Sequence, residues 1–282
     1  MKKRIWAWAF AAAMLGGSLS VQAQAVTTDN TNNTETTKVE TTNQEKQAVQ
    51  VTFKKLGGEI RDGRKGSLLV KIRGNYPILT ASSENAAVNK INDYYKAQVE
   101  AVNKQKEVAY EAAKEYYNKE VYKSDEGDPN SWKGYELNNT YTLAHQGDKV
   151  ISFIKLDSSY TGDETTGPKR SIENFDLNTG ELLTFKDIVT DETKAQQYIH
   201  DYIVDEIKDA VDDDKGYLYY GYKDHVEECL AEGNWYLSDS GIVVLMNEYV
   251  FTPQAEGTKT FYIPLSTFPY FCLLYTSDAA DD

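Results

Sequence analysis

The sequence is poor in the residues from which catalytic and metal centres are built. It contains only three histidines, His145, His200 and His225, and none belongs to an HExxH pattern or another closely spaced pair of metal ligands. GxSxG, P-loop and GxGxxG motifs are absent as well. We therefore predict a protein that is not an enzyme, with no catalytic residues, no bound metal and no cofactor.

Cysteine and long apolar runs are also scarce. The two cysteines, Cys229 and Cys272, do not make a disulfide framework. After the N-terminal segment, every apolar stretch is short and interrupted by charge, whereas a membrane-spanning helix needs about 20 apolar residues. These features predict a chain without a transmembrane anchor.

The first 25 residues have the organisation of a cleavable signal peptide. Three positive charges in Met1–Arg4 precede an apolar run from Ile5 to Leu15, and small residues end in the A-x-A signal Ala23–Ala25. The alternative is an N-terminal membrane anchor, which the shortness of the apolar run disfavours. We predict an extracytoplasmic protein, periplasmic or secreted, after cleavage of residues 1–25.

The charge balance is strongly acidic and excludes some partners. The chain carries a formal charge of −14, and removal of the three positive charges of residues 1–25 leaves −17. Such a chain repels nucleic acid and anionic lipid and favours cationic partners. Solubility alone is the other explanation of this charge.

Both ends of the remaining chain differ in composition from its middle. Residues 26–50 are rich in Thr and Asn and almost free of apolar side chains, so we predict a disordered linker. Residues 269–282 include a stretch from Cys272 onward that looks like translated adaptor sequence, so we expect a non-native tail outside the fold.

Apolar periodicity predicts an α+β fold. A long helix capped by Ser82 or Ser83 should run to about Tyr122. Residues 104–106 interrupt its apolar stripe, which leaves a kink or a division into two helices open. A medium helix should follow a cap at Thr190 or Asp191, and a short one should cover residues 225–230. Strands are expected at 51–56, 68–72, 135–145, 149–156, 171–176, 181–185, 235–237, 242–246 and 259–263. The strands come in blocks joined by hairpins, which indicates a mostly antiparallel sheet with one long and one medium helix packed on it.

The long helix carries a stripe typical of core packing, and the two halves of the chain should be close. Its apolar positions are Val88, Ile91, Tyr95, Val102, Ala109, Ala113 and Tyr116. Only the polar residues 157–170 separate the strand ending at Leu156 from the strand starting at Ser171. We therefore expect the two halves to share one sheet or to pack closely, with residues 157–170 forming a loop.

Two segments have the chemistry of a binding surface. Tyr219 and Tyr220 lie in a run of tyrosines that could contact a ligand or instead pack a strand edge. Asn247, Glu248 and Tyr249 follow an apolar strand, and Pro253 and Gly257 shape the loop after it. We predict ligand contacts at these seven residues; the alternative is that Tyr249 is a core residue and the loop only connects strands.

Three segments together resemble a known bacterial family. Residues 171–188, SIENFDLNTGELLTFKDI, resemble the NFDLxTGxxLTLxDLF hairpin of RsiV-type anti-sigma factors and PdaC-type peptidoglycan deacetylases. Residues 235–257 resemble the end of the same domain, and the third segment is formed by Tyr76-Pro77, Ile91-Asn92 and residues 160–162, which are similar to its companion domain. The resemblance implies a PdaC-like N-terminal domain at 51–168 and an RsiV-like C-terminal domain at 169–268.

This chain also departs from that family. Residues 160–167 read YTGDETTG where the family often has YTGGAHG, so any role of that histidine is absent. The cytoplasmic segment and membrane span of the anti-sigma factors, and the metal-binding histidines of the deacetylase, are missing too. RsiV-type proteins recognise lysozyme, a cationic protein. The resemblance therefore implies an exported, non-catalytic binding protein of the cell envelope, for lysozyme or a peptidoglycan-related ligand. An enzyme or accessory domain acting on peptidoglycan, and a structural envelope protein without a specific ligand, remain the alternatives.

Overall fold

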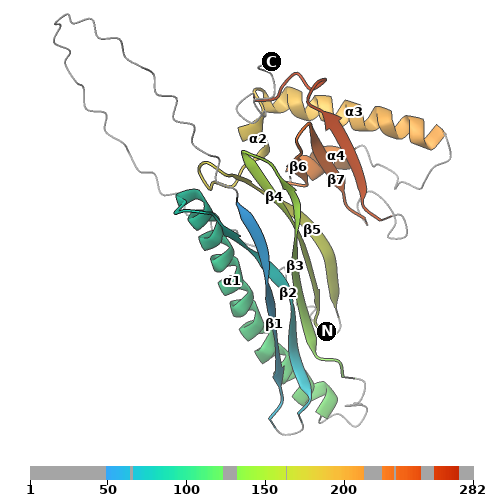
Figure 1. The fold of residues 1–282 in the computed structure, drawn as a ribbon. Helices are drawn as coiled ribbons and strands as arrows, with labels where there is room; N and C mark the ends of the chain where they lie inside the picture. Colours follow the sequence, from blue (N-terminus) through green and yellow to red (C-terminus); the bar gives the residue numbers. More distant parts are fainter. Residues whose placement is uncertain are drawn as a thin grey trace, which may run out of the picture. The chain divides into compact units, whose positions relative to one another are not determined.

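A computed structural model describes residues 49–63, 66–122, 132–162, 164–212, 224–231, 233–248 and 257–272. The predictions for the signal peptide (1–25), for residues 26–48 and for residues 273–282 lie outside these ranges, as do those for Tyr219, Tyr220, Tyr249 and Pro253. The described chain is α+β, as the sequence predicts, with two β-sheets and few helices (Figure 1).

The larger sheet has five strands in the order of the sequence. They are β1 (Gln50–Arg61), β2 (Leu68–Thr80), β3 (Tyr135–Gln146), β4 (Val150–Tyr160) and β5 (Thr165–Asp176). Neighbouring strands are antiparallel except β2 and β3, which are parallel. Parallel neighbours need a long crossover connection, and helix α1 (Ala86–Tyr116) with the π-helical turn η1 (Tyr117–Tyr122) lies within it.

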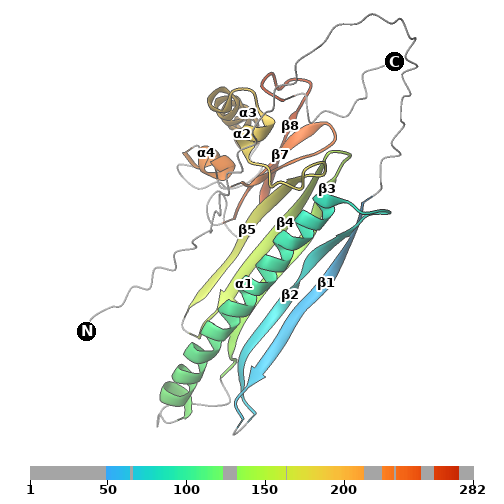
Figure 2. The same cartoon turned by 90° about the vertical axis from the view of Figure 1, so that its left-hand side faces the viewer.

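Helix α1 runs along one face of this sheet (Figure 2). Its predicted stripe faces the sheet: five of the seven positions are buried, and Ala109 and Tyr116 are half-buried against the cluster that contains Ala113. The predicted cap at Ser82 or Ser83 is wrong, because Asn85 Oδ1 accepts a hydrogen bond from the backbone N–H of Val88 at 3.0 Å. The helix also continues without a break through residues 104–106.

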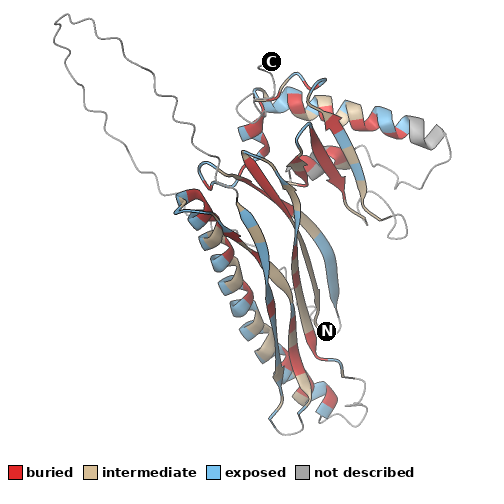
Figure 3. Cartoon of the chain, viewed as in Figure 1, coloured by how far each residue is buried: buried red, intermediate tan, exposed pale blue. Residues whose placement is uncertain are grey.

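The smaller sheet has three antiparallel strands, β6 (Trp235–Leu237), β7 (Gly241–Met246) and β8 (Lys259–Pro264). Helices α2 (Phe185–Ile188), α3 (Glu192–Asp212) and α4 (Asp224–Ala231) precede it in the chain. Every residue of β7 is buried, as Figure 3 shows, and one core cluster joins all three strands to side chains of the three helices. Asp191, one of the two predicted caps of α3, accepts a hydrogen bond from the N–H of Lys194 at 3.2 Å.

The expectation that the two halves share one sheet is confirmed, because β4 of the first half pairs with residues 171–176 of β5, where the second half begins. The strands β6, β7 and β8 form a separate sheet. The smaller sheet packs against β5 of the larger sheet. Ile172 on β5 lies in one buried cluster with Val243 and Leu245 on β7, and Asn174 Nδ2 donates to the carbonyl oxygen of Trp235 at 2.8 Å.

Residues 157–170 do not form the predicted loop. Strand β4 continues to Tyr160 and β5 already begins at Thr165, so this polar stretch is a hairpin closed by the bond from Thr161 N to Glu164 O at 2.9 Å. Polar side chains are compatible with a strand where one face meets solvent. The predicted domain boundary between residues 168 and 169 therefore falls inside β5.

The strand predicted at 181–185 is also wrong. Only an isolated bridge between Phe175 and Leu182 forms there, and Phe185 begins α2. The N–H of Thr184 donates to Asp187 Oδ2 at 2.8 Å, which stabilises a helix start that the apolar pattern did not reveal.

The outer boundaries of the fold differ slightly from the predicted ones. Strand β1 begins at Gln50, and Val49 packs against the core, so the predicted linker ends too late at residue 50. The predicted tail begins too early at residue 269. Phe271 is buried and pairs with Val189, and the N–H of Cys272 donates to Ile188 O at 2.8 Å. Within the described ranges, no helix combines the length and apolar character needed to cross a membrane.

Candidate functional site

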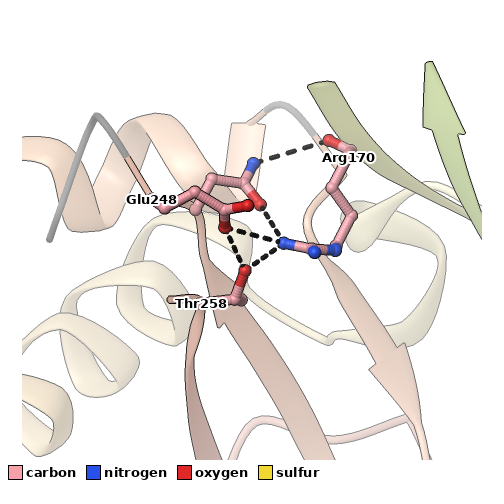
Figure 4. A network of polar contacts seen from close by, with 4 residues as sticks. Arg170, Glu248 and Thr258 are labelled. Carbon is pink, nitrogen blue, oxygen red and sulfur yellow. Dashed lines mark hydrogen bonds and ion pairs between the residues drawn. The ribbon is translucent and has the colours of Figure 1, made fainter. Parts of the chain in front are cut away.

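The candidate site is a network of polar side chains around Arg170 (Figure 4). Arg170 lies on β5 and extends to Glu248, which follows β7, with Nη1 3.1 Å from Glu248 Oε2. The side chains of Arg170 and Glu248 are only 20% and 12% exposed to solvent, respectively. An ion pair this sheltered is screened less by salt than a surface pair.

The same network includes residues on both sides of the segment 249–256. Arg170 Nη1 donates to Asn247 Oδ1 at 3.4 Å, and Asn247 Nδ2 donates to the carbonyl oxygen of Arg170 at 3.4 Å. Arg170 also donates to the hydroxyl of Thr258, which in turn donates to Glu248 Oε2. The network therefore connects the residues before and after this segment to the larger sheet.

Local sequence explains why these side chains meet. The apolar run of β7 ends at Met246, which pairs with Lys259, the first residue of β8. Asn247 and Thr258 therefore flank the last paired position of the two strands. Gly257 adopts a φ of +66°, a left-handed conformation that glycine adopts without steric cost, and so permits the chain to enter β8.

The network favours a charged Glu248. Partial burial pushes the pKa of this carboxyl upward, but the hydroxyl of Thr258 and the guanidinium of Arg170 outweigh burial and hold the pKa below its usual value. Glu248 therefore remains ionised and bound to Arg170 through the neutral range. The arrangement has positive, negative and neutral hydrogen-bonding groups but no activated nucleophile among its members.

The structure brings together two of the predicted site residues, Asn247 and Glu248, and Gly257 directly precedes Thr258 of the same network. Tyr249, Pro253, Tyr219 and Tyr220 fall outside the described ranges. Arg170 and Thr258 were not among the residues predicted from the sequence. Arg170 was expected in a loop, and no local signal indicates its contact with a residue 78 positions later. Thr258 directly follows the predicted loop, and this position next to Gly257 is the sequence feature that could have identified it as a site residue.

A second polar cluster is buried beneath α1. Glu173 on β5 is only 8% exposed, and its Oε1 accepts a hydrogen bond from the hydroxyl of Tyr94 at 3.1 Å. Burial raises the pKa of Glu173, while Tyr95, Lys155 and Tyr94 act in the opposite direction. Burial and the neighbouring Glu173 also raise the pKa of each nearby tyrosine hydroxyl: Tyr94, Tyr95 and Tyr141.

Glu173 should make folding stability depend on pH. Because its pKa is raised in the folded state, the unfolded chain ionises first, near pH 4.5, and stability falls from there up to the folded pKa. The charged groups acting on this carboxyl are Lys155, which lowers its pKa, and Asp157, which raises it. We expect Glu173→Gln to gain stability relative to the wild type across this window, by up to about 1.4 kcal/mol per pH unit. Urea unfolding between pH 4 and pH 7 measures the difference.

The control is Glu107→Gln, at an exposed position on α1. It should follow the wild-type pH profile. A difference between Glu173→Gln and the wild type that does not change with pH contradicts the prediction.

The histidines each lie near one carboxylate. His145 Nε2 is 3.4 Å from Asp239, His200 Nδ1 is 3.0 Å from Asp201, and His225 Nδ1 is 2.8 Å from Glu228. In the part of the chain that the structure describes, no group of three or more His, Cys, Asp or Glu side chains could hold a metal ion.

The fold and the network define an α+β protein in which a five-stranded sheet is connected to a three-stranded sheet by a sheltered ion pair. Residues 186–266 match a family model described as a protein of unknown function, DUF3298. This match covers α3, α4 and the smaller sheet, and it leaves Arg170 outside. No curated protein matches the chain.

Solved structures of DUF3298 family members are similar to this chain over most of its length. A crystal structure from Bacteroides fragilis has 18% sequence identity and a TM-score of 0.57, covering 78% of this chain and 92% of its own. One from Pseudomonas aeruginosa has 14% identity and a TM-score of 0.45, covering 76% of this chain and 91% of its own. The first likeness supports a shared fold that extends beyond the matched residues 186–266.

Proposed function

We propose that this protein is an exported, non-catalytic binding protein of the cell envelope, and that its ligand contacts the segment 249–256. The observation that carries the proposal is the network of Arg170, Asn247, Glu248 and Thr258, which anchors both ends of this segment. Anchored ends reduce the conformational entropy that a binding segment loses when it meets its partner.

A cationic protein such as lysozyme is the proposed partner. The chain is acidic, with a formal charge of −14, and complementary charge accelerates association and disfavours partners of like charge. Residues 171–188 and 235–257 resemble the RsiV-type family, whose members recognise lysozyme. Tyr249 would act as an interface anchor, because a tyrosine combines a large contact area with a hydroxyl group.

The test is calorimetric titration of the purified protein with lysozyme and, separately, with soluble peptidoglycan fragments. We expect lysozyme to bind and Tyr249→Ala to weaken binding at least about tenfold, a typical cost of removing an interface anchor. The melting temperature of this variant should not change. The matched control is Tyr262→Ala, which removes an exposed tyrosine from β8 and should leave the affinity unchanged.

A second variant tests the anchoring network itself. Arg170→Met keeps an aliphatic side chain but leaves the sheltered Glu248 without its cation, so both stability and lysozyme affinity should fall. Three results contradict the proposal: no binding of lysozyme, full affinity in Tyr249→Ala, or an affinity loss in Tyr249→Ala that accompanies unfolding. Binding of peptidoglycan fragments alone assigns the protein to a different ligand.

A further inference from the structure

Three buried polar atoms from three different elements lie close together beneath α1. They are the hydroxyl of Tyr95 on α1, the hydroxyl of Tyr141 on β3, and Oε2 of Glu173 on β5. The two tyrosines are 0% and 1% exposed, and their ring centroids are 5.3 Å apart in an edge-to-face arrangement. These side chains are therefore fully enclosed by the packing of α1 on the sheet.

None of these three atoms forms a hydrogen bond with the protein. Glu173 uses its other oxygen, Oε1, to accept from Tyr94, whereas Oε2 has no donor. The Glu173 carboxylate lies near the hydroxyls of Tyr95 and Tyr141 and raises the pKa of both, through its charge and through weak hydrogen-bonding contact. Neither contact has the distance and angle of a proper hydrogen bond. A buried polar atom without a partner is costly, and three in one cluster are unusual in a native protein.

The hydrogen-bonding capacities of the three groups are complementary to those of one water molecule. The two hydroxyls can each donate to the oxygen of a water, and the carboxylate oxygen can accept one of its hydrogens. Buried waters typically make about three such bonds to otherwise unsatisfied groups. A hard cation fits less well, because Ca²⁺ takes six or more oxygen ligands and Lys155 already supplies positive charge near this carboxylate.

We propose that Tyr95, Tyr141 and Glu173 bind a single internal water molecule that connects α1 to β3 and β5. The water completes the hydrogen bonds of the three side chains. It also joins α1 to β3 and β5, which already meet here through the contacts of the Tyr95 ring with Tyr141 and Phe175 and through the hydrogen bond from Tyr94 to Glu173. This site is independent of the Arg170 network and of the proposed function.

A double-mutant cycle tests the proposal in solution. Tyr95→Phe and Tyr141→Phe should each lower the ratio of folded to unfolded protein about fivefold, which corresponds to the loss of one net hydrogen bond. Because both hydroxyls bind the same water, the double variant should lose much less than the product of the two single effects. Chemical denaturation followed by circular dichroism measures all three.

The control pairs Tyr95→Phe with Tyr198→Phe, whose hydroxyl donates to Thr267 O at 2.8 Å in the other core. These two effects should multiply. A crystal structure then identifies the bound species, with a solvent peak expected about 2.6–3.2 Å from all three atoms. Independent effects of Tyr95→Phe and Tyr141→Phe, or a direct bond of either hydroxyl to Glu173 with no solvent peak between them, would overturn the proposal.

Discussion

Replacing Gly74 with alanine is expected to lower the free energy of unfolding by about 3–5 kcal/mol. Gly74 pairs with Asn139 at the end of the parallel contact between β2 and β3, and its φ is +152°. A Cβ at this position would lie 1.7 Å from the backbone oxygen of Asn139. Backbone cannot rotate away as a flexible side chain can, so the two strands would have to separate locally.

Gly58→Ala is the matched control in the same sheet. A Cβ at Gly58 has no atom within 4 Å, and this residue lies on β1 opposite Ile72. Its stability should change by less than about 1 kcal/mol. Urea unfolding followed by circular dichroism measures both variants. Equal stabilities of the two variants would show that β2 and β3 do not approach as closely as the structure indicates.

Trp235→Ala should lower the free energy of unfolding by roughly 3–5 kcal/mol, a loss similar to that expected for Gly74→Ala. Trp235 is 1% exposed, and its ring meets that of Phe185 edge to face at 5.7 Å. It belongs to the core cluster that joins α2, α3 and α4 to β6, β7 and β8. Removal of the indole leaves a cavity that the surrounding side chains fill only in part.

The neighbouring Tyr236 supplies the control for this substitution. Tyr236 is half-buried on the opposite face of β6, so Tyr236→Ala should cost clearly less than Trp235→Ala. Thermal unfolding of the two variants, followed by far-ultraviolet circular dichroism of the backbone, compares their stabilities. A larger loss in Tyr236→Ala would mean that the contact between the two sheets, and not the core of the smaller sheet, dominates stability.

Elements with a strong local pattern were predictable from the sequence. The stripe of α1, the hairpin of β3 and β4, and the strands β6, β7 and β8 follow from apolar periods of 3.6 or 2 and from turn residues between them. Their ends were predicted less well. Asn85, not Ser82 or Ser83, caps α1. Ser82, Ser83 and Asn85 all have side chains that can cap a helix, and a local pattern locates a helix end only to within about one or two residues.

Elements whose pattern is weak were predicted wrongly. The first half of β5 is polar and was expected to be a loop, yet it pairs with the second half of β4, which ends at Tyr160. The apolar residues 182–185 suggested a strand, but a capping box makes Phe185 the start of α2. In both places, pairing or capping outweighed the side-chain pattern.

The sequence by itself determined the α+β class, the main helices and strands, and the position of Asn247 and Glu248 at the end of an apolar strand. Only the tertiary structure decided that Arg170 pairs with Glu248, 78 positions away, and that Glu173 is buried beneath Tyr94 and Tyr95. Periodicity reports which face of an element avoids water, and it is a local property of the chain. The partner of a charged side chain depends on strand register and on how two sheets pack, which no local pattern contains.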